Sequence, residues 1–65
     1  MSNLSLIAAK IYVKLCTDTV FEDKFLSANE PYRMAITESG YANNITDGSA
    51  EYHKVVDILE VLVCG

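Results

Sequence analysis

The chain has 65 residues, 51% of them hydrophobic, and its nine acidic and five basic side chains give a net charge of −4 at pH 7. So short a chain forms one domain, 1–65, and buries only about 60% of the surface that its unfolded form exposes. An acidic chain repels phosphate, so direct binding of nucleic acid is not expected, and the longest uncharged runs are too short to span a membrane.

The mean hydropathy of +0.19 indicates more apolar material than so small a monomer can readily bury. We expect an all-α protein, a small bundle of three to four helices that is completed by homodimerisation. The opening residues lack the basic region and cleavage site of a signal peptide. The protein is therefore expected to be cytoplasmic, with both cysteines reduced.

Residues 4–16 show the apolar spacing of an amphipathic helix, and Asn3 or Ser2 can cap its first turn. The side chains expected on its core face are Leu4, Ile7, Ala8, Ile11, Tyr12 and Leu15. Lys10 and Lys14, four residues apart, form a narrow solvent-facing stripe.

Residues 17–19 are all of helix-capping types, and Thr19 and Glu22 fit the capping-box pattern. We expect a break or kink near Asp18 and a second helix over 19–27. The alternative is one continuous helix over 3–27, because such residues are also tolerated inside a helix.

Pro31 marks the first turn of a third helix over 31–38, with Asn29 or Glu30 at its cap. Gly40 can adopt the left-handed conformation that closes this helix. Turn-forming residues then crowd the segment 41–48, which predicts a loop.

The most apolar stretch, 49–63, is predicted to be the helix around which the chain is organised. Its polar stripe consists of His53, Lys54, Asp57 and Glu60. The rest of its circumference is apolar, as in a helix at the centre of a bundle or across a dimer seam. Asp47 or Ser49 is expected to cap it. The predicted oligomer interface consists of Val55, Ile58, Leu59 and Leu62.

The sequence contains no residue set typical of catalysis. His53 and Asp57 lie one helical turn apart, but a structural zinc site needs a second pair of ligands. Cys16 is expected at a helix C-terminus, where the dipole disfavours a thiolate, and Cys64 is no better placed. Both are interpreted as buried packing residues or bystanders, and a disulfide requires their helix ends to meet. We predict a protein that is not an enzyme and holds no metal or cofactor.

The acidic side chains fall into two segments, 17–30 and 41–65, and the four tyrosines combine an aromatic ring with a polar tip, which suits interfaces. The predicted partner-binding residues are Asp18, Glu22, Asp23, Tyr32, Arg33 and Tyr41. Tyr32 and Tyr41 are the tyrosines expected nearest the surface. This pattern favours a protein-binding module that occludes or redirects a partner protein with a basic surface.

Two alternatives remain open. The first is a small oligomeric binder of an anionic molecule such as a nucleotide, with a pocket at a subunit junction lined by Tyr12, Tyr32 and Arg33. The second is a structural subunit of a larger assembly. In general character the chain is similar to many small proteins of phages and mobile elements that inhibit or redirect a larger host factor, a resemblance of type that transfers no residues.

Overall fold

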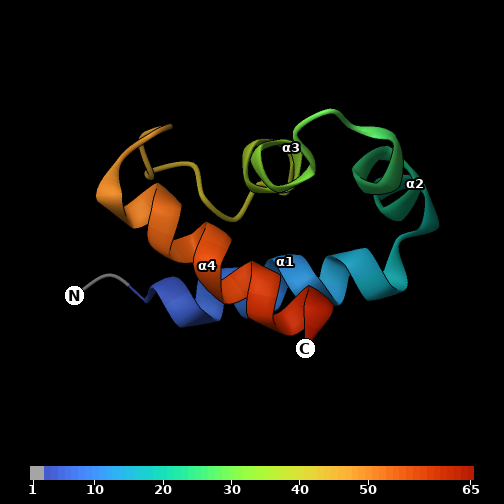
Figure 1. Cartoon of the computed structure of the whole chain (residues 1–65), viewed down its shortest axis with the longest axis horizontal. Coiled ribbons are helices and arrows are strands. Elements are labelled where there is room, and N and C mark those ends of the chain that lie inside the picture. The colour runs from blue at the N-terminus through green and yellow to red at the C-terminus, as the bar shows by residue number, and fades with distance from the viewer. Residues whose placement is uncertain (1–2) are drawn as a thin grey trace.

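The computed structural model describes residues 3–65, and four helices make up most of this part of the chain. They are α1 (Leu4–Thr17), α2 (Thr19–Ser27), α3 (Pro31–Glu38) and α4 (Ala50–Cys64). No strand occurs in residues 3–65, which confirms the all-α prediction. The long helices α1 and α4 cross each other, and α2 and α3, seen nearly end-on, lie together above them (Figure 1).

A single chain closes the hydrophobic core. The radius of gyration, 10.7 Å, is close to the roughly 11 Å expected of a folded domain of this length. The buried side chains are Ala8, Ile11, Leu15, Phe21, Ala35, Ile36, Ala42, Tyr52, Val55 and Leu59. All four helices contribute side chains to this core.

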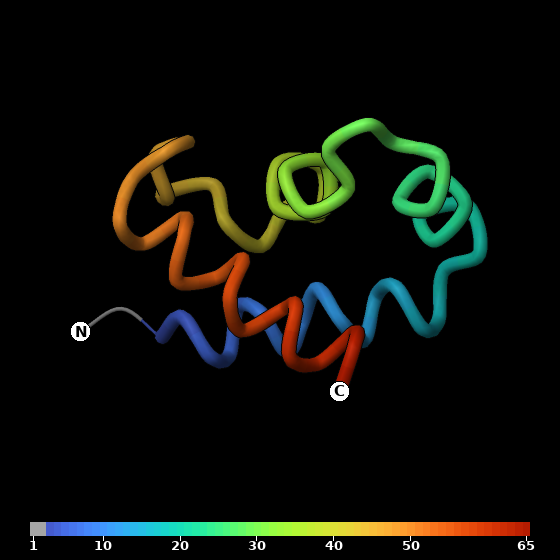
Figure 2. Tube along the Cα trace, in the orientation of Figure 1, coloured from blue at the N-terminus to red at the C-terminus, as the bar shows by residue number. Residues whose placement is uncertain are grey.

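The centre of the core lies where α1 packs against α4, the most extensive helix contact of the fold. Ile11 of α1 and Val55 and Leu59 of α4 have no exposed surface. The path of the chain shows the C-terminal end of α4 coming down beside α1 (Figure 2). Val55 and Leu59, predicted to lie in an oligomer interface, are enclosed within one chain, whereas Ile58 and Leu62 remain half-buried.

The chain breaks between α1 and α2 at Asp18, as expected, so the alternative of one continuous helix is wrong. The Asp18 carboxylate accepts a hydrogen bond from the backbone amide of Phe21 at 3.1 Å, which caps α2. It also lies 3.3 Å from the Lys14 ammonium. The predicted capping box was placed one residue too late, because Thr19 is already the first residue of the helix.

The other helix starts lie where the sequence placed them, but only one has a side-chain cap. Asn3 precedes α1 and Glu30 precedes α3 without a capping hydrogen bond from either side chain. The alternative cap Ser2 lies outside the described residues. At α4 the Ser49 hydroxyl accepts a hydrogen bond from the backbone amide of Tyr52 at 3.1 Å.

The predicted loop is confirmed and connects α3 to α4 over 39–49. Gly40 and Gly48 have φ angles of +83° and +79°, a left-handed conformation that glycine adopts without steric penalty. Ala42 is buried and Ile45 is half-buried, so the loop folds back onto the core. Within residues 3–65, no helix is both long and apolar enough to cross a membrane.

Candidate functional site

Several large apolar side chains remain on the surface after the core has formed. They are Leu6, Val13, Val20, Leu26, Tyr41, Val61 and Val63. Leu26 and Val61 are the most exposed, at 73% and 70%. Contiguous apolar surface on a small protein marks an interaction site more often than isolated apolar residues do. Most of these side chains border two surfaces, described next.

The first surface is a hollow between the C-terminal half of α1, α2 and the last turn of α4, here called the α1–α2–α4 groove. Its lining residues are Tyr12, Leu15, Cys16, Glu22, Phe25, Leu26 and Val63. Its volume is about 140 Å³. Leu15 is buried and Phe25 half-buried, so they close its base, whereas Leu26 and Val63 are exposed at its edge. The Cys16 thiol, beside the Tyr12 hydroxyl, raises the pKa of Tyr12.

The rim of the groove is acidic. Glu22 lines the groove, and Asp23 follows it on the exposed surface of α2. Neither is among the acids that pair with a base in the described part of the chain. The next residue, Lys24, reaches toward Glu38 of α3 at 3.4 Å. Negative charge without a nearby counter-ion thus borders apolar surface here.

Asp18 was grouped with Glu22 and Asp23 as a partner-binding residue, but its carboxylate is engaged within the chain. The amide of Phe21 and the ammonium of Lys14 bind the carboxylate and hold the pKa of Asp18 below its ordinary value. Lys14 also lies over the Phe21 ring, 5.1 Å from its centroid. The main role visible for Asp18 is to start α2.

The second surface is an outward strip of α1 beside the loop, here called the α1 face, formed by Leu6, Ala9, Lys10, Val13 and Tyr41. Leu6, Ala9 and Val13 have the spacing that places residues on one side of a helix. The Lys10 ammonium lies 6.0 Å from the centroid of the Tyr41 ring. Tyr41 is exposed, as predicted. Lys10 is the one charged residue among those that form this face, so the charge of the face is positive.

Arg33 lies away from both surfaces, and its charge is already matched. Its guanidinium Nε is 3.5 Å from the Asp47 carboxylate and 3.8 Å from that of Glu30. A hydrogen bond to the Tyr52 hydroxyl at 3.5 Å and these two carboxylates raise the pKa of Arg33. An anionic ligand would therefore meet two carboxylates beside this guanidinium, which disfavours its binding.

The three residues predicted to bind an anionic molecule do not share one site within the chain. Tyr12 lines the groove, whereas Tyr32 and Arg33 line a separate hollow with Tyr52 and His53. Tyr32 is half-buried, and its ring packs edge-to-face against the ring of Phe25 in α2. Its hydroxyl lies 3.9 Å from the sulfur of Cys64. Burial raises the pKa of the Tyr32 hydroxyl.

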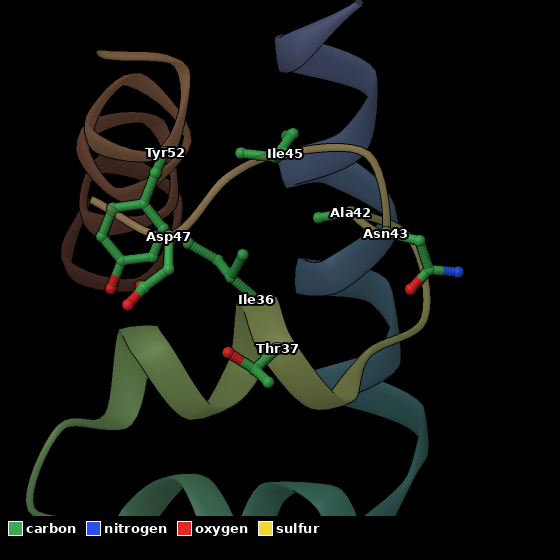
Figure 3. A pocket seen from close by; sticks show the side chains of 7 residues that line it. All are labelled: Ile36, Thr37, Ala42, Asn43, Ile45, Asp47 and Tyr52. Carbon is green, nitrogen blue, oxygen red and sulfur yellow. The ribbon is translucent and has the colours of Figure 1, made fainter. Parts of the chain in front are cut away.

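A wider hollow of about 270 Å³ lies between α3, the loop and the start of α4 (Figure 3). Tyr52 and Asp47 lie close together on one wall, and the Asn43 amide points away from the centre (Figure 3). Asp47, the one charged group in its lining, is held by Arg33. We interpret this hollow as a consequence of how the loop packs, because its polar groups do not converge on a common point.

The groups considered for metal binding and nucleophilic chemistry are all on the surface. Cys16 and Cys64 are free and exposed, so of the two interpretations burial in the core is wrong and the bystander interpretation remains. His53 and Asp57 are exposed on α4. In residues 3–65 no three histidine, cysteine or carboxylate side chains gather closely enough to hold a metal ion.

The groove is the feature that sequence reasoning missed. Glu22 was singled out by its charge, but Leu26 and Val63 fell only within the expected helices 19–27 and 49–63 and received no role. No signal in the sequence pairs the end of α2 with the last turn of α4.

No protein-family model, characterised protein sequence or solved structure matches this chain.

Proposed function

We propose that this chain is a non-enzymatic protein-binding module that occludes or redirects a partner protein with a basic surface in the cytoplasm. The observation that carries the proposal is the α1–α2–α4 groove, in which exposed apolar side chains adjoin the unpaired carboxylate of Glu22. Apolar burial supplies affinity, and complementary charge selects the partner and speeds encounter. The net charge of −4 also attracts a basic partner at longer range.

Binding is better supported than catalysis by the side chains at the groove. Glu22 is exposed at the rim of the groove, where its carboxylate can pair with a basic side chain of a partner. Cys16 is exposed, and the residues that line the groove include no histidine that could act as its base. The groove thus supplies shape and charge, which are the requirements of recognition.

We also propose that the chain forms homodimers, using the α1 face in place of α4. Leu6 and Val13 are exposed there on either side of Ala9, whose small side chain lets a second helix approach closely. Lys10 makes this face unsuitable for a basic partner, and in a two-fold dimer its long, exposed side chain can extend past the apolar contact into solvent. The groove adjoins this face along α1, because Cys16 in the groove lies three residues after Val13, so the dimer contact must end before Cys16 for the groove to stay open.

The two other functions suggested by the sequence receive less support. The anionic-molecule alternative depended on Arg33, which is paired with Asp47 and Glu30. The structural-subunit alternative would use the same apolar surfaces, and no described contact favours permanent assembly over reversible binding. We therefore propose neither.

Affinity capture with charge-reversal variants tests the proposed function. Glu22→Lys reverses the charge at the rim of the groove, and Asp57→Lys makes the same reversal at an exposed position of α4. We expect the immobilised wild-type chain and Asp57→Lys to retain the same basic protein from a cell lysate, and Glu22→Lys to lose it. Equal retention by all three would show that the groove rim is not the binding site.

A further inference from the structure

We infer that the α1–α2–α4 groove receives one short amphipathic helix of the partner, which inserts a single apolar side chain and presents a lysine or arginine about one turn away to Glu22. This inference rests on the proposed function and specifies the segment that the partner must supply. It follows from the size of the groove, the helices that flank it and the position of its charge.

The size of the groove limits what can be inserted. Its volume is about 140 Å³, and an apolar protein cavity of about 150 Å³ holds a benzene molecule. One side chain of leucine, isoleucine, methionine or phenylalanine is therefore accommodated between Leu26 and Val63. Two such side chains would not fit, so the partner contributes one anchor.

The flanking helices favour a helical ligand. Two ridges border the groove, one from α1 with Tyr12 and Cys16 and one from α2 with Glu22 and Leu26. An amphipathic helix binds by laying its apolar face into an apolar groove of this kind. Addition of a strand requires an exposed sheet edge, and no strand exists in residues 3–65.

The position of Glu22 fixes where the ligand carries its charge. Glu22 and Leu26 are four residues apart on α2, so their side chains are neighbours along the helix surface, about 5–6 Å between Cβ atoms. A bound helix that places its apolar anchor against Leu26 must therefore carry its base three or four residues from that anchor. Asp23 adds a second negative charge beside this position.

A selection from displayed random peptides of about 12 residues, roughly three helical turns, tests this inference with the full chain as bait. We expect enriched peptides to share one leucine, isoleucine, methionine or phenylalanine and a lysine or arginine three or four positions away. One enriched peptide is then synthesised together with a control in which alanine replaces the anchor. Binding to Glu22→Lys should be about tenfold weaker than to wild type or Asp57→Lys.

Cys16 reports directly on occupancy because its exposed thiol lines the groove. In a Cys64→Ser background, which leaves one thiol, the enriched peptide should slow alkylation of Cys16 and the alanine control should not. Enriched peptides without the basic residue, or unchanged alkylation at saturation, would overturn the inference. If lysate capture depends on Glu22 but no amphipathic peptide is enriched, the helix-in-groove inference fails while the proposed function stands. If both fail, the proposed function falls as well.

Discussion

At the scale of single residues, neighbours on α4 have very different surroundings. Leu59 has no exposed surface, whereas Val61, two residues later, is 70% exposed. A helix turns by about 100° per residue, so two residues along the chain suffice to move a side chain from the core to solvent. Some apolar side chains of α4 therefore pack in the core, whereas others are exposed on the surface.

Truncation of these two side chains should distinguish the core position from the exposed one. Leu59→Ala leaves a cavity in the core and should lower the free energy of unfolding by roughly 2–5 kcal/mol. Val61→Ala removes little buried contact and should change it by no more than about 0.5 kcal/mol. Urea denaturation followed by circular dichroism measures both, and equal destabilisation by the two substitutions would contradict the assignment of the core.

Asp18 should make stability depend on pH in the acidic range. Its pKa is lowered in the folded chain by the amide of Phe21 and by Lys14, whereas an unfolded aspartate titrates near about 3.9. The carboxylate's contribution to stability is therefore fully present above the unfolded value and is lost as the pH falls through the lower folded value.

Substitution of Asp18 by asparagine tests this assignment, because asparagine keeps an oxygen for the capping hydrogen bond but does not titrate. Between about pH 6 and about pH 2, the Tm of wild type should fall by more than that of Asp18→Asn. Both proteins carry the same other carboxyl groups, so the difference between the two curves reports on Asp18. Parallel loss of Tm in the two proteins would show that Asp18 does not contribute in this way.

At the scale of elements, α4 depends on its first turn for a defined start. The Ser49 hydroxyl satisfies the amide of Tyr52, and Tyr52 itself is buried. The β-branched residues of α4 have modest helix propensity, so its stability comes from packing against α1 and from this cap.

Removal of this cap should be measurable. Ser49→Ala should lower the free energy of unfolding by about 0.5–2 kcal/mol. The matched control is Ser5→Ala, because Ser5 is exposed in the first turn of α1 and its hydroxyl makes no hydrogen bond within residues 3–65. Thermal unfolding of both variants gives the comparison, and an unchanged Tm for Ser49→Ala would mean that the cap contributes nothing.

Much of this local structure was predictable because its signals are local. Pro31, Gly40 and Ser49 act within a few residues of themselves, and the apolar period indicates each core face. The cap of α2 was placed one residue late because three capping residues stand in a row, and local pattern does not rank them. The structure shows that the Asp18 carboxylate accepts a hydrogen bond from the amide of Phe21, so Asp18 is the cap of α2.

The candidate site was less predictable because it depends on contacts between distant segments. Glu22 and Asp23 could be singled out by charge, but the groove exists only because the last turn of α4 lies beside α1 and α2. Arg33 was predicted to bind a ligand because a free guanidinium was assumed. Its pairing with Asp47 depends on how the loop folds back onto α3.

At the scale of the whole molecule, two apolar surfaces remain outside a core that one chain closes. The α1 face carries Lys10, and the α1–α2–α4 groove carries Glu22. Because their charges are opposite, a basic partner suits the groove and not the α1 face. The central claim is that a second copy covers the α1 face and a basic partner occupies the groove.

The most direct test is the absolute mass in solution, measured by light scattering behind a sizing column over a range of concentrations. It compares wild type with Val13→Glu on the α1 face and Leu26→Glu at the groove, both at exposed positions where folding should persist. We predict a dimer of twice the 7.2 kDa chain mass for wild type and Leu26→Glu, and a monomer for Val13→Glu. A wild-type monomer at all concentrations, or a dimer broken by Leu26→Glu and not by Val13→Glu, would contradict the account.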